Sequence, residues 1–235
     1  EDAPETFSTG NLLNERIEID RAFNVSFRNC QFEDNREWAA ISPKKTAIKA
    51  DNVTNLKVTS SYPYVVNKTS INNFKYGIRA ITSGEEHKIE VSNVDFSTSK
   101  GIYLLNYMGA NNIKIINSNF YVKPFAEHGI EYGTKLPGNP DPIDPAPFTR
   151  PYGIYVDGIA INYHIEGNYF TSDGDKTNKF GIVVNNNWQA TNEIYRNRFN
   201  NLENSVQAIG LNRSLDYLDY DGVETLCNNF TNSNT

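Results

Sequence analysis

The sequence is poor in the residues that most often hold metals or cross-link small proteins. Its 235 residues include two cysteines, three histidines and one methionine. This excludes a cysteine-rich disulfide framework, and no two histidines lie at metal-ligand spacing. No apolar run approaches the ~18 residues of a membrane-spanning helix. With 22 basic and 28 acidic side chains, the net charge of −6 argues against a nucleic-acid partner, which would need a basic patch.

Asparagine and aromatic residues are abundant instead. Apolar residues make up 38% of the chain, aromatic residues 12%, and asparagine occurs 33 times. The aromatic content is unlike that of a disordered chain. The length fits a single domain spanning residues 1–235.

A six-residue phrase recurs along the chain. It starts with an apolar residue, contains asparagine at its third or fourth position, and ends in phenylalanine. Copies occupy residues 27–32, 91–96, 115–120, 165–170, 194–199 and, in a weaker form, 225–230. A shortened copy ends at Phe74. Gly-Ile follows most copies, at Gly77, Gly101, Gly129, Gly153 and Gly181, with Ala47-Ile48 as an earlier variant. Repeats spaced by 20–50 residues indicate a solenoid.

The local pattern within each repeat is that of a strand. Apolar residues alternate with polar ones, as in Ile89-Glu90-Val91 and Ile113-Lys114-Ile115, which is the period of a β-strand. The sequence therefore predicts a parallel β-helix of about 7–8 coils, each rising ~4.8 Å, in a rod about 35 Å tall. Asparagine at the bends can adopt the left-handed conformation and form amide ladders. The phenylalanines should stack in one internal column.

The repeat resembles that of the pectin-lyase-like superfamily of right-handed parallel β-helices. The resemblance rests on residues 115–120, 165–170 and 194–199 with their Gly-Ile partners, and it covers residues 17–230. It implies an all-β, right-handed parallel β-helix. It does not imply one activity, because this superfamily includes lyases, hydrolases, epimerases, phage tailspikes and adhesive passengers.

Two segments interrupt the repeat. Residues 131–151 hold six of the ten prolines, so we expect one long, stiff inserted loop that covers a flank of the rod or forms a wall of a substrate cleft. Residues 173–178 contain Asp173 and Asp175, whose oxygen atoms suit calcium. Their spacing does not match an EF-hand loop, so the sequence favours a plain turn and predicts no cofactor, with calcium as the alternative.

Four aromatic residues are candidates for ligand contact, and the positions of the two cysteines predict whether they form a disulfide. Trp38, Trp188, Tyr217 and Tyr220 fall in predicted loops, where they could stack on sugar rings or simply cover the rod. Cys30 and Cys227 fall near opposite ends of the predicted rod, about 30 Å apart by the coil rise. A disulfide needs Cα atoms within ~7 Å, so the sequence predicts two free, buried thiols.

Recognisable catalytic phrases are missing from the sequence. The Asp-Asp, Gly-His-Gly and Arg-Ile-Lys phrases of pectinolytic hydrolases are absent. The candidate catalytic residues are Asp157, His164, Glu166, Arg150 and Lys179. Asp157 and Glu166 fall on adjacent predicted segments, and two carboxylates 5–10 Å apart would suit glycoside hydrolysis. His164 should face solvent. The net negative charge disfavours polyuronate substrates.

Two functions follow as hypotheses. The first is a secreted or cell-surface β-helix module: a non-catalytic passenger, adhesive or glycan-contacting rod. The missing cap after Phe230 suggests that such a rod is a fragment of a longer protein, and secretion machinery would be a partner if it is secretion cargo. The alternative is a polysaccharide lyase or glycoside hydrolase with a groove along the β-helix. A polysaccharide or cell-surface glycan is the expected partner in both cases.

Overall fold

Parallel β-strands form nearly all of the regular structure. The computed structural model describes residues 15–34, 46–61, 68–83, 87–107, 113–124, 126–127, 130–131, 150–158, 160, 162–187, 191–213 and 222–233. These residues contain 23 strands and no helix. Within this described part, therefore, no helix could cross a membrane.

Three parallel sheets of seven strands each make up the body of the protein. Sheet 1 contains β1 (Glu15–Asp20), β4 (Thr46–Asp51), β7 (Tyr76–Ile81), β10 (Lys100–Leu105), β15 (Tyr152–Asp157), β18 (Phe180–Asn185) and β21 (Asn204–Ile209). Sheet 2 contains β2 (Val25–Arg28), β5 (Asn55–Thr59), β8 (Lys88–Ser92), β11 (Ile113–Ile116), β16 (Tyr163–Glu166), β19 (Thr191–Tyr195) and β22 (Gly222–Leu226). Sheet 3 contains β3 (Gln31–Glu33), β6 (Ser70–Asn72), β9 (Asp95–Thr98), β12 (Asn119–Val122), β17 (Tyr169–Thr171), β20 (Arg198–Asn200) and β23 (Asn229–Thr231).

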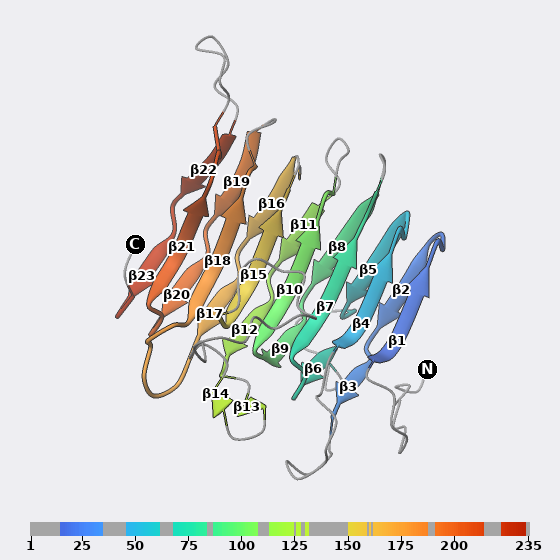
Figure 1. Cartoon of the computed structure of the whole chain (residues 1–235), viewed down its shortest axis with the longest axis horizontal. Helices are drawn as coiled ribbons and strands as arrows, with labels where there is room; N and C mark the ends of the chain where they lie inside the picture. Colours follow the sequence, from blue (N-terminus) through green and yellow to red (C-terminus); the bar gives the residue numbers. More distant parts are fainter. Residues whose placement is uncertain are drawn as a thin grey trace.

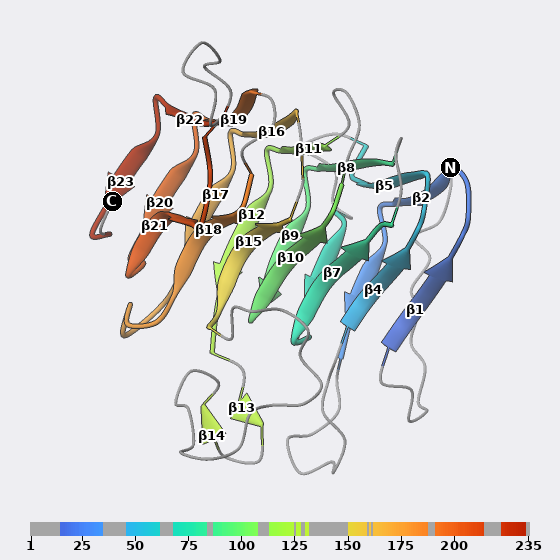
Figure 2. The ribbon, with the colours of Figure 1, turned by 45° about the horizontal axis from the view of Figure 1, so that its top comes forward.

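The chain visits the three sheets in turn, so one strand from each forms a round, and each new round pairs with the previous one (Figure 1). The rounds progress steadily from the N-terminal to the C-terminal end of the molecule (Figure 2). This all-β, solenoid-like arrangement is consistent with the predicted parallel β-helix.

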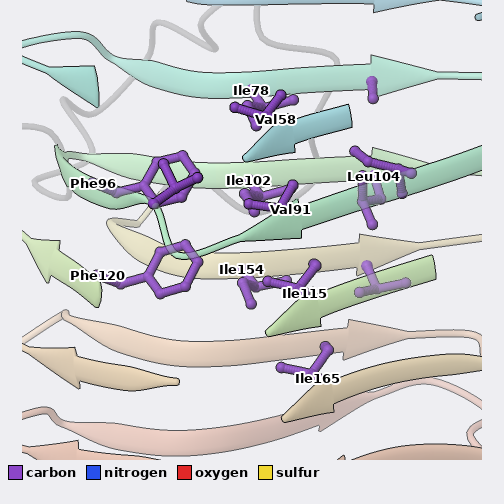
Figure 3. Close-up of a cluster of buried hydrophobic side chains, with 14 of the residues drawn as sticks. Val58, Ile78, Val91, Phe96, Ile102, Leu104, Ile115, Phe120, Ile154 and Ile165 are labelled. Atoms are coloured by element: carbon purple, nitrogen blue, oxygen red, sulfur yellow. The ribbon is translucent and has the colours of Figure 1, made fainter. Parts of the chain in front are cut away.

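The phenylalanine column predicted from the repeat is confirmed. Neighbouring rings from Phe96, Phe120, Phe170, Phe199 and Phe230 stack with centroids 4.7, 4.7, 4.9 and 5.4 Å apart. Isoleucine and valine columns run beside them, and Figure 3 shows both kinds of column in the centre of the core. The internal side chains of successive rounds therefore form continuous columns, as the sequence repeat predicts.

The Gly-Ile phrase belongs to the same packing unit as the phenylalanine. A Cβ atom placed on Gly77 would lie 2.8 Å from Cδ1 of Phe96 and 2.6 Å from the carbonyl oxygen of Gly101. The isoleucine after each glycine continues an internal column, since Ile78 pairs with Ile102. Glycine suits Gly77 because the aromatic ring lies directly against the backbone, whereas Ala47 and Ser205 take the equivalent positions of the second and last rounds.

Two of the repeat copies were assigned wrongly from the sequence. Ile71, not Phe74, pairs with Phe32 and Phe96 in sheet 3, because Ser70–Asn72 forms the strand and Phe74 follows it. Gly129-Ile130 is not a Gly-Ile copy of a round. Ile130 belongs to a short antiparallel pair, β13 (Ala126–Glu127) and β14 (Ile130–Glu131), while β10 pairs directly with β15.

The inserted segment consequently begins before residue 131. It leaves the rounds after β12 and includes β13 and β14, which precede the predicted boundary. β15 (Tyr152–Asp157) resumes the rounds by pairing with β10. Residues 132–149, which contain most of the predicted proline-rich loop, lie outside the described residues.

Both cysteines are free, but only one is buried as predicted. Cys30 is buried and Cys227 is exposed. Cys227 occupies an outward position with φ near +54° at the bend between sheets 2 and 3. Cys30 lies one residue further along the equivalent bend, where the side chain points inward. The prediction for Cys227 is wrong because the two cysteines differ by one position within the repeat.

Candidate functional site

The outer face of sheet 1 carries a second apolar cluster, separate from the core. In β10, Ile102 and Leu104 point into the core, so Tyr103 and Leu105 point outward. The outward cluster consists of the buried residues Tyr76, Tyr103, Tyr152, Tyr155, Phe180 and Val183. Aromatic side chains in neighbouring strands make this face unlike the polar outer face expected of a sheet turned to solvent.

A carboxylate lies at the edge of this aromatic face. Asp157, at the end of β15, is 8% exposed. Its Oδ1 accepts hydrogen bonds from Nδ2 of Asn185 at 2.9 Å and from the backbone N–H of Gly158 at 2.8 Å. The hydroxyl of Tyr103 donates to Oδ2 of Asp157 at 3.4 Å, and Asn185 also donates to Tyr155 at 3.4 Å. We call Asp157, Tyr103, Tyr155 and Asn185 the Asp157 cluster.

The two tyrosines of this cluster are held in the neutral form. Burial, followed by the negative charge of Asp157, raises the pKa of Tyr103 and of Tyr155 well above the ordinary tyrosine value. Both hydroxyls therefore act as hydrogen-bond donors or acceptors at neutral pH, rather than as bases.

The predicted basic residues contribute to structure around this face. Arg150 places its guanidinium carbon 5.5 Å from the centre of the Phe180 ring and lies 3.9 Å from a carboxylate oxygen of Glu203. Nζ of Lys179 donates to the carbonyl oxygen of Asp173 at 2.7 Å. Each cation is thus engaged with a neighbouring group of the protein.

The remaining predicted catalytic residues lie on a different sheet. His164 faces outward from sheet 2, as predicted, with Nδ1 2.8 Å from Oε2 of Glu193. Glu166 ends β16, whereas Asp157 ends β15. A corner and the whole of β16, which alone spans roughly 10 Å at the strand rise, separate these carboxylates along the chain. The carboxylates of Asp157 and Glu166 therefore lie on the outer faces of two different sheets, and the structure shows no contact between them.

Residues 173–178 form a turn whose carboxylates are engaged locally. Oδ1 of Asp175 accepts hydrogen bonds from the backbone N–H and the hydroxyl of Thr177, at 2.9 and 2.6 Å. A hydrogen bond with Tyr121 lowers the pKa of Asp173 and raises the pKa of Tyr121 to about 12. Among the described residues, no group of three or more acidic, histidine or cysteine side chains is arranged to hold a metal ion.

An exposed group of aromatic and basic side chains lies at the corner between sheets 2 and 3. Tyr169, which is 38% exposed, lies beside exposed Arg198 in the parallel register. The guanidinium carbon of Arg196 lies 4.7 Å from the centre of the half-buried Tyr195 ring. We call Tyr169, Tyr195, Arg196 and Arg198 the corner patch.

Reasoning from the sequence found Asp157 but neither its partners in the Asp157 cluster nor the corner patch. Gly-Ile-Tyr occurs twice, at Tyr103 and Tyr155, and these tyrosines pair in register with ring centroids 5.5 Å apart. That repetition could have indicated an aromatic outer face. The ligand-binding candidates Trp38, Trp188, Tyr217 and Tyr220 lie outside the described residues.

Comparisons with protein families, curated proteins and solved structures found no match. The resemblance to the pectin-lyase-like superfamily thus stays a prediction that rests on the repeat itself.

Proposed function

We propose that this chain is a non-catalytic β-helix module, secreted or displayed at a cell surface, that contacts glycans. In this proposal the rounds wind with the right-handed sense of pectin-lyase-like proteins and form a stiff rod within a larger protein. Support comes from the seven-stranded parallel sheets and from the phenylalanine column that runs from Phe96 to Phe230. A scaffold of this kind presents outward side chains at fixed spacing on its faces.

The observation that carries the non-catalytic role is the dispersal of the polar candidates. Asp157 faces out from sheet 1, His164 from sheet 2, and Asp173 lies in the turn after β17. The acid and base of a hydrolase or lyase must converge on one bond of the substrate. These groups instead form hydrogen bonds or ion pairs with neighbours in their own faces of the rod.

The glycan-contacting role is supported by the kinds of side chain that face outward. Tyrosine presents a flat apolar ring with a polar tip, and asparagine and arginine offer planar hydrogen-bonding groups. Such side chains are exposed at Tyr169, Arg198 and Asn229 on one outer column of sheet 3. Sugars offer complementary C–H faces and hydroxyl groups.

The Asp157 cluster favours one alternative, a polysaccharide lyase or glycoside hydrolase. A buried carboxylate beside two neutral tyrosine hydroxyls and an amide is an arrangement that can hold or transfer a proton. In this alternative Asp157 is the acid or base and Tyr103 assists it.

A panel of neutral and acidic polysaccharides tests both functions. We expect binding, measured by affinity electrophoresis, without release of reducing or unsaturated sugar ends. Turnover that Asp157→Asn abolishes and Asp175→Asn preserves would establish the enzyme instead. Asp175 is a suitable control because its carboxylate bonds Thr177 within its own turn and is not one of the residues of the Asp157 cluster. Absence of binding to every polymer would contradict the glycan-contacting role.

A further inference from the structure

Arg196 of the corner patch occupies an unusual backbone position. The equivalent bend residue has positive φ in six of the seven rounds: Asn29, Asn93, Asn117, Gly167, Arg196 and Cys227, with φ between 52° and 66°, while Ser60 holds this position in the second round. Asparagine and glycine adopt this conformation readily, whereas a long side chain costs roughly 1 kcal/mol there. Arginine at this bend therefore costs stability, which makes its side chain a candidate for a functional role.

The two arginines of the patch are free to bind a ligand. Neither Arg196 nor Arg198 forms an ion pair with any residue in the described part of the chain. Both are exposed, and Arg196 is supported by the ring of Tyr195 beneath its guanidinium. Two guanidinium groups without an ion-pair partner in the described part of the chain thus lie two residues apart at one exposed corner.

The backbone beneath these arginines is rigid. Asn197, which lies between them, is fully buried. Its side chain donates to the carbonyl oxygen of Ile165 at 2.7 Å and accepts from the backbone N–H of Asn168 at 3.0 Å. The guanidinium group of Arg196 therefore projects from a hydrogen-bonded bend and that of Arg198 from the strand that follows it, so little backbone order would be lost on binding.

A tyrosine and acidic side chains lie next to the two arginines of the corner patch. Tyr169 lies next to Arg198 and presents an exposed ring. Acidic side chains lie on the sheet 2 side of the patch. Glu166 neighbours Tyr195 in register, and Glu193, which is paired with His164, lies two residues before Tyr195 on the same outer face. On the sheet 3 side, the register neighbours of Arg198 are Tyr169 and Asn229, which carry no charge. The positive charge of Arg198 is therefore not offset within that sheet, and the flat Tyr169 ring beside it suits the face of a sugar.

We infer that the corner patch binds the anionic groups, carboxylate or sulfate, of a charged polysaccharide. This inference rests on the proposed glycan-contacting function and names its site and ligand class. Guanidinium groups bind such anions through paired, charge-assisted hydrogen bonds, while Tyr169 packs against the adjacent sugar ring. The overall charge of −6 slows the approach of a polyanion, so binding depends on this local arrangement.

Three polymers with one backbone test the ligand class: dextran sulfate, carboxymethyl dextran and unmodified dextran. We expect the two charged polymers to bind and dextran to bind at least about tenfold more weakly. Binding should weaken between 50 mM and 500 mM salt because exposed charges are screened. Arg198→Gln should weaken binding of the charged polymers by about tenfold.

Arg196→Asn separates binding from folding. Asparagine suits the bend better than arginine, so the thermal midpoint should rise by about 1–3 °C while binding of the charged polymers falls about tenfold. Arg21→Asn is the matched control, because Arg21 also has a positive φ, near 50°, and is exposed at a different bend. It should raise the midpoint similarly and leave binding unchanged.

The outcomes distinguish this site from the wider function. Undiminished binding in Arg196→Asn and Arg198→Gln would overturn the corner patch as the site and leave glycan contact standing. Equal binding of dextran, or binding of poly-glutamate in place of the charged dextrans, would overturn the ligand class. Failure of the wild-type protein to bind any polysaccharide of the full panel would overturn the proposed function as well.

Discussion

The same bend between sheets 2 and 3 is built in two ways along the rod. In three of the first four rounds, asparagine itself takes the left-handed position, at Asn29, Asn93 and Asn117. In the later rounds, asparagine moves one residue on and points inward, as at Asn168, Asn197 and Asn228. The inward residues form a ladder, since backbone N–H groups of Asn168 and Asn197 each donate to the amide oxygen of the next round at 3.0 and 2.9 Å.

This difference shows that the same left-handed bend can be stabilised by an outward asparagine or by an inward one. Outward asparagine lowers the cost of the left-handed conformation at the residue that adopts it. Inward asparagine instead satisfies buried backbone groups of the neighbouring round, which are costly to leave unpaired. In the later rounds the left-handed position is occupied by Gly167, Arg196 and Cys227. The Arg196 side chain at this position is then available for the binding role proposed above.

Loss of an inward asparagine should have the largest effect. Asn197→Ala leaves the backbone N–H of Asn168 and the carbonyl of Ile165 without their partners. We expect a loss of about 2–4 kcal/mol in the free energy of unfolding, measured in urea. Asn200→Ala, which removes a single hydrogen bond of 3.4 Å to Thr171, should cost under about 1 kcal/mol. Equal losses for the two variants would contradict the ladder.

Gly167→Ala should rank second. Gly167 has φ of +66°, and a Cβ atom there would lie 2.6 Å from Oδ1 of Asn117. We expect a loss of about 2 kcal/mol, from backbone strain and the displaced amide. Gly174→Ala is the control because Gly174 has φ of +59° and nothing within 4 Å of the added atom. It should cost about 1 kcal/mol, and a loss as large as that of Gly167→Ala would exclude the steric contribution.

Outward asparagine should matter less. Asn93→Ala keeps the bend but places alanine at φ near +56°, which should cost about 1 kcal/mol in urea unfolding. Asn93→Gly should recover most of that loss, since glycine adopts this conformation freely. If glycine proved as damaging as alanine, the Asn93 side chain would be stabilising the fold by contacts rather than by its backbone preference.

The smallest effect is expected at the exposed cysteine. Cys227→Asn should raise the thermal midpoint by about 1 °C or less, because asparagine suits φ near +54° better. A thiol reagent should modify one thiol in the native wild-type protein and none in the variant, since Cys30 is buried. Two reactive thiols in the native protein would contradict the inward placement of Cys30.

Features that repeat could be predicted from the sequence, and features that occur once could not. Each phenylalanine packs on its counterpart in the next round, so the spacing of Phe96, Phe120 and Phe170 reports the column directly. Ile71 fills the same column without matching the phrase, because the position requires an apolar side chain rather than an aromatic one. The phrase Gly129-Ile130 matches the repeat, but Ile130 does not join a round because it pairs with Glu127 in a separate antiparallel sheet.

The candidate sites depend on which residues of different rounds become neighbours. Asp157 was identified as a candidate, but its partners Tyr103 and Asn185 come from β10 and β18. The corner patch likewise joins Tyr169 of β17 to Arg198 of β20. These pairs follow only once the register of the sheets is known, and a one-residue shift would turn each side chain to the other face.

Hydrogen exchange of asparagine side-chain amides tests the two kinds of bend most directly. The amide groups of Asn168 and Asn197 are buried and hydrogen-bonded, whereas Asn29 and Asn93 are half-buried. Measured by NMR in the native protein, the Nδ2 protons of Asn168 and Asn197 should exchange at least about 100-fold more slowly than those of Asn29 and Asn93. Equal exchange rates in the two groups would contradict the inward ladder.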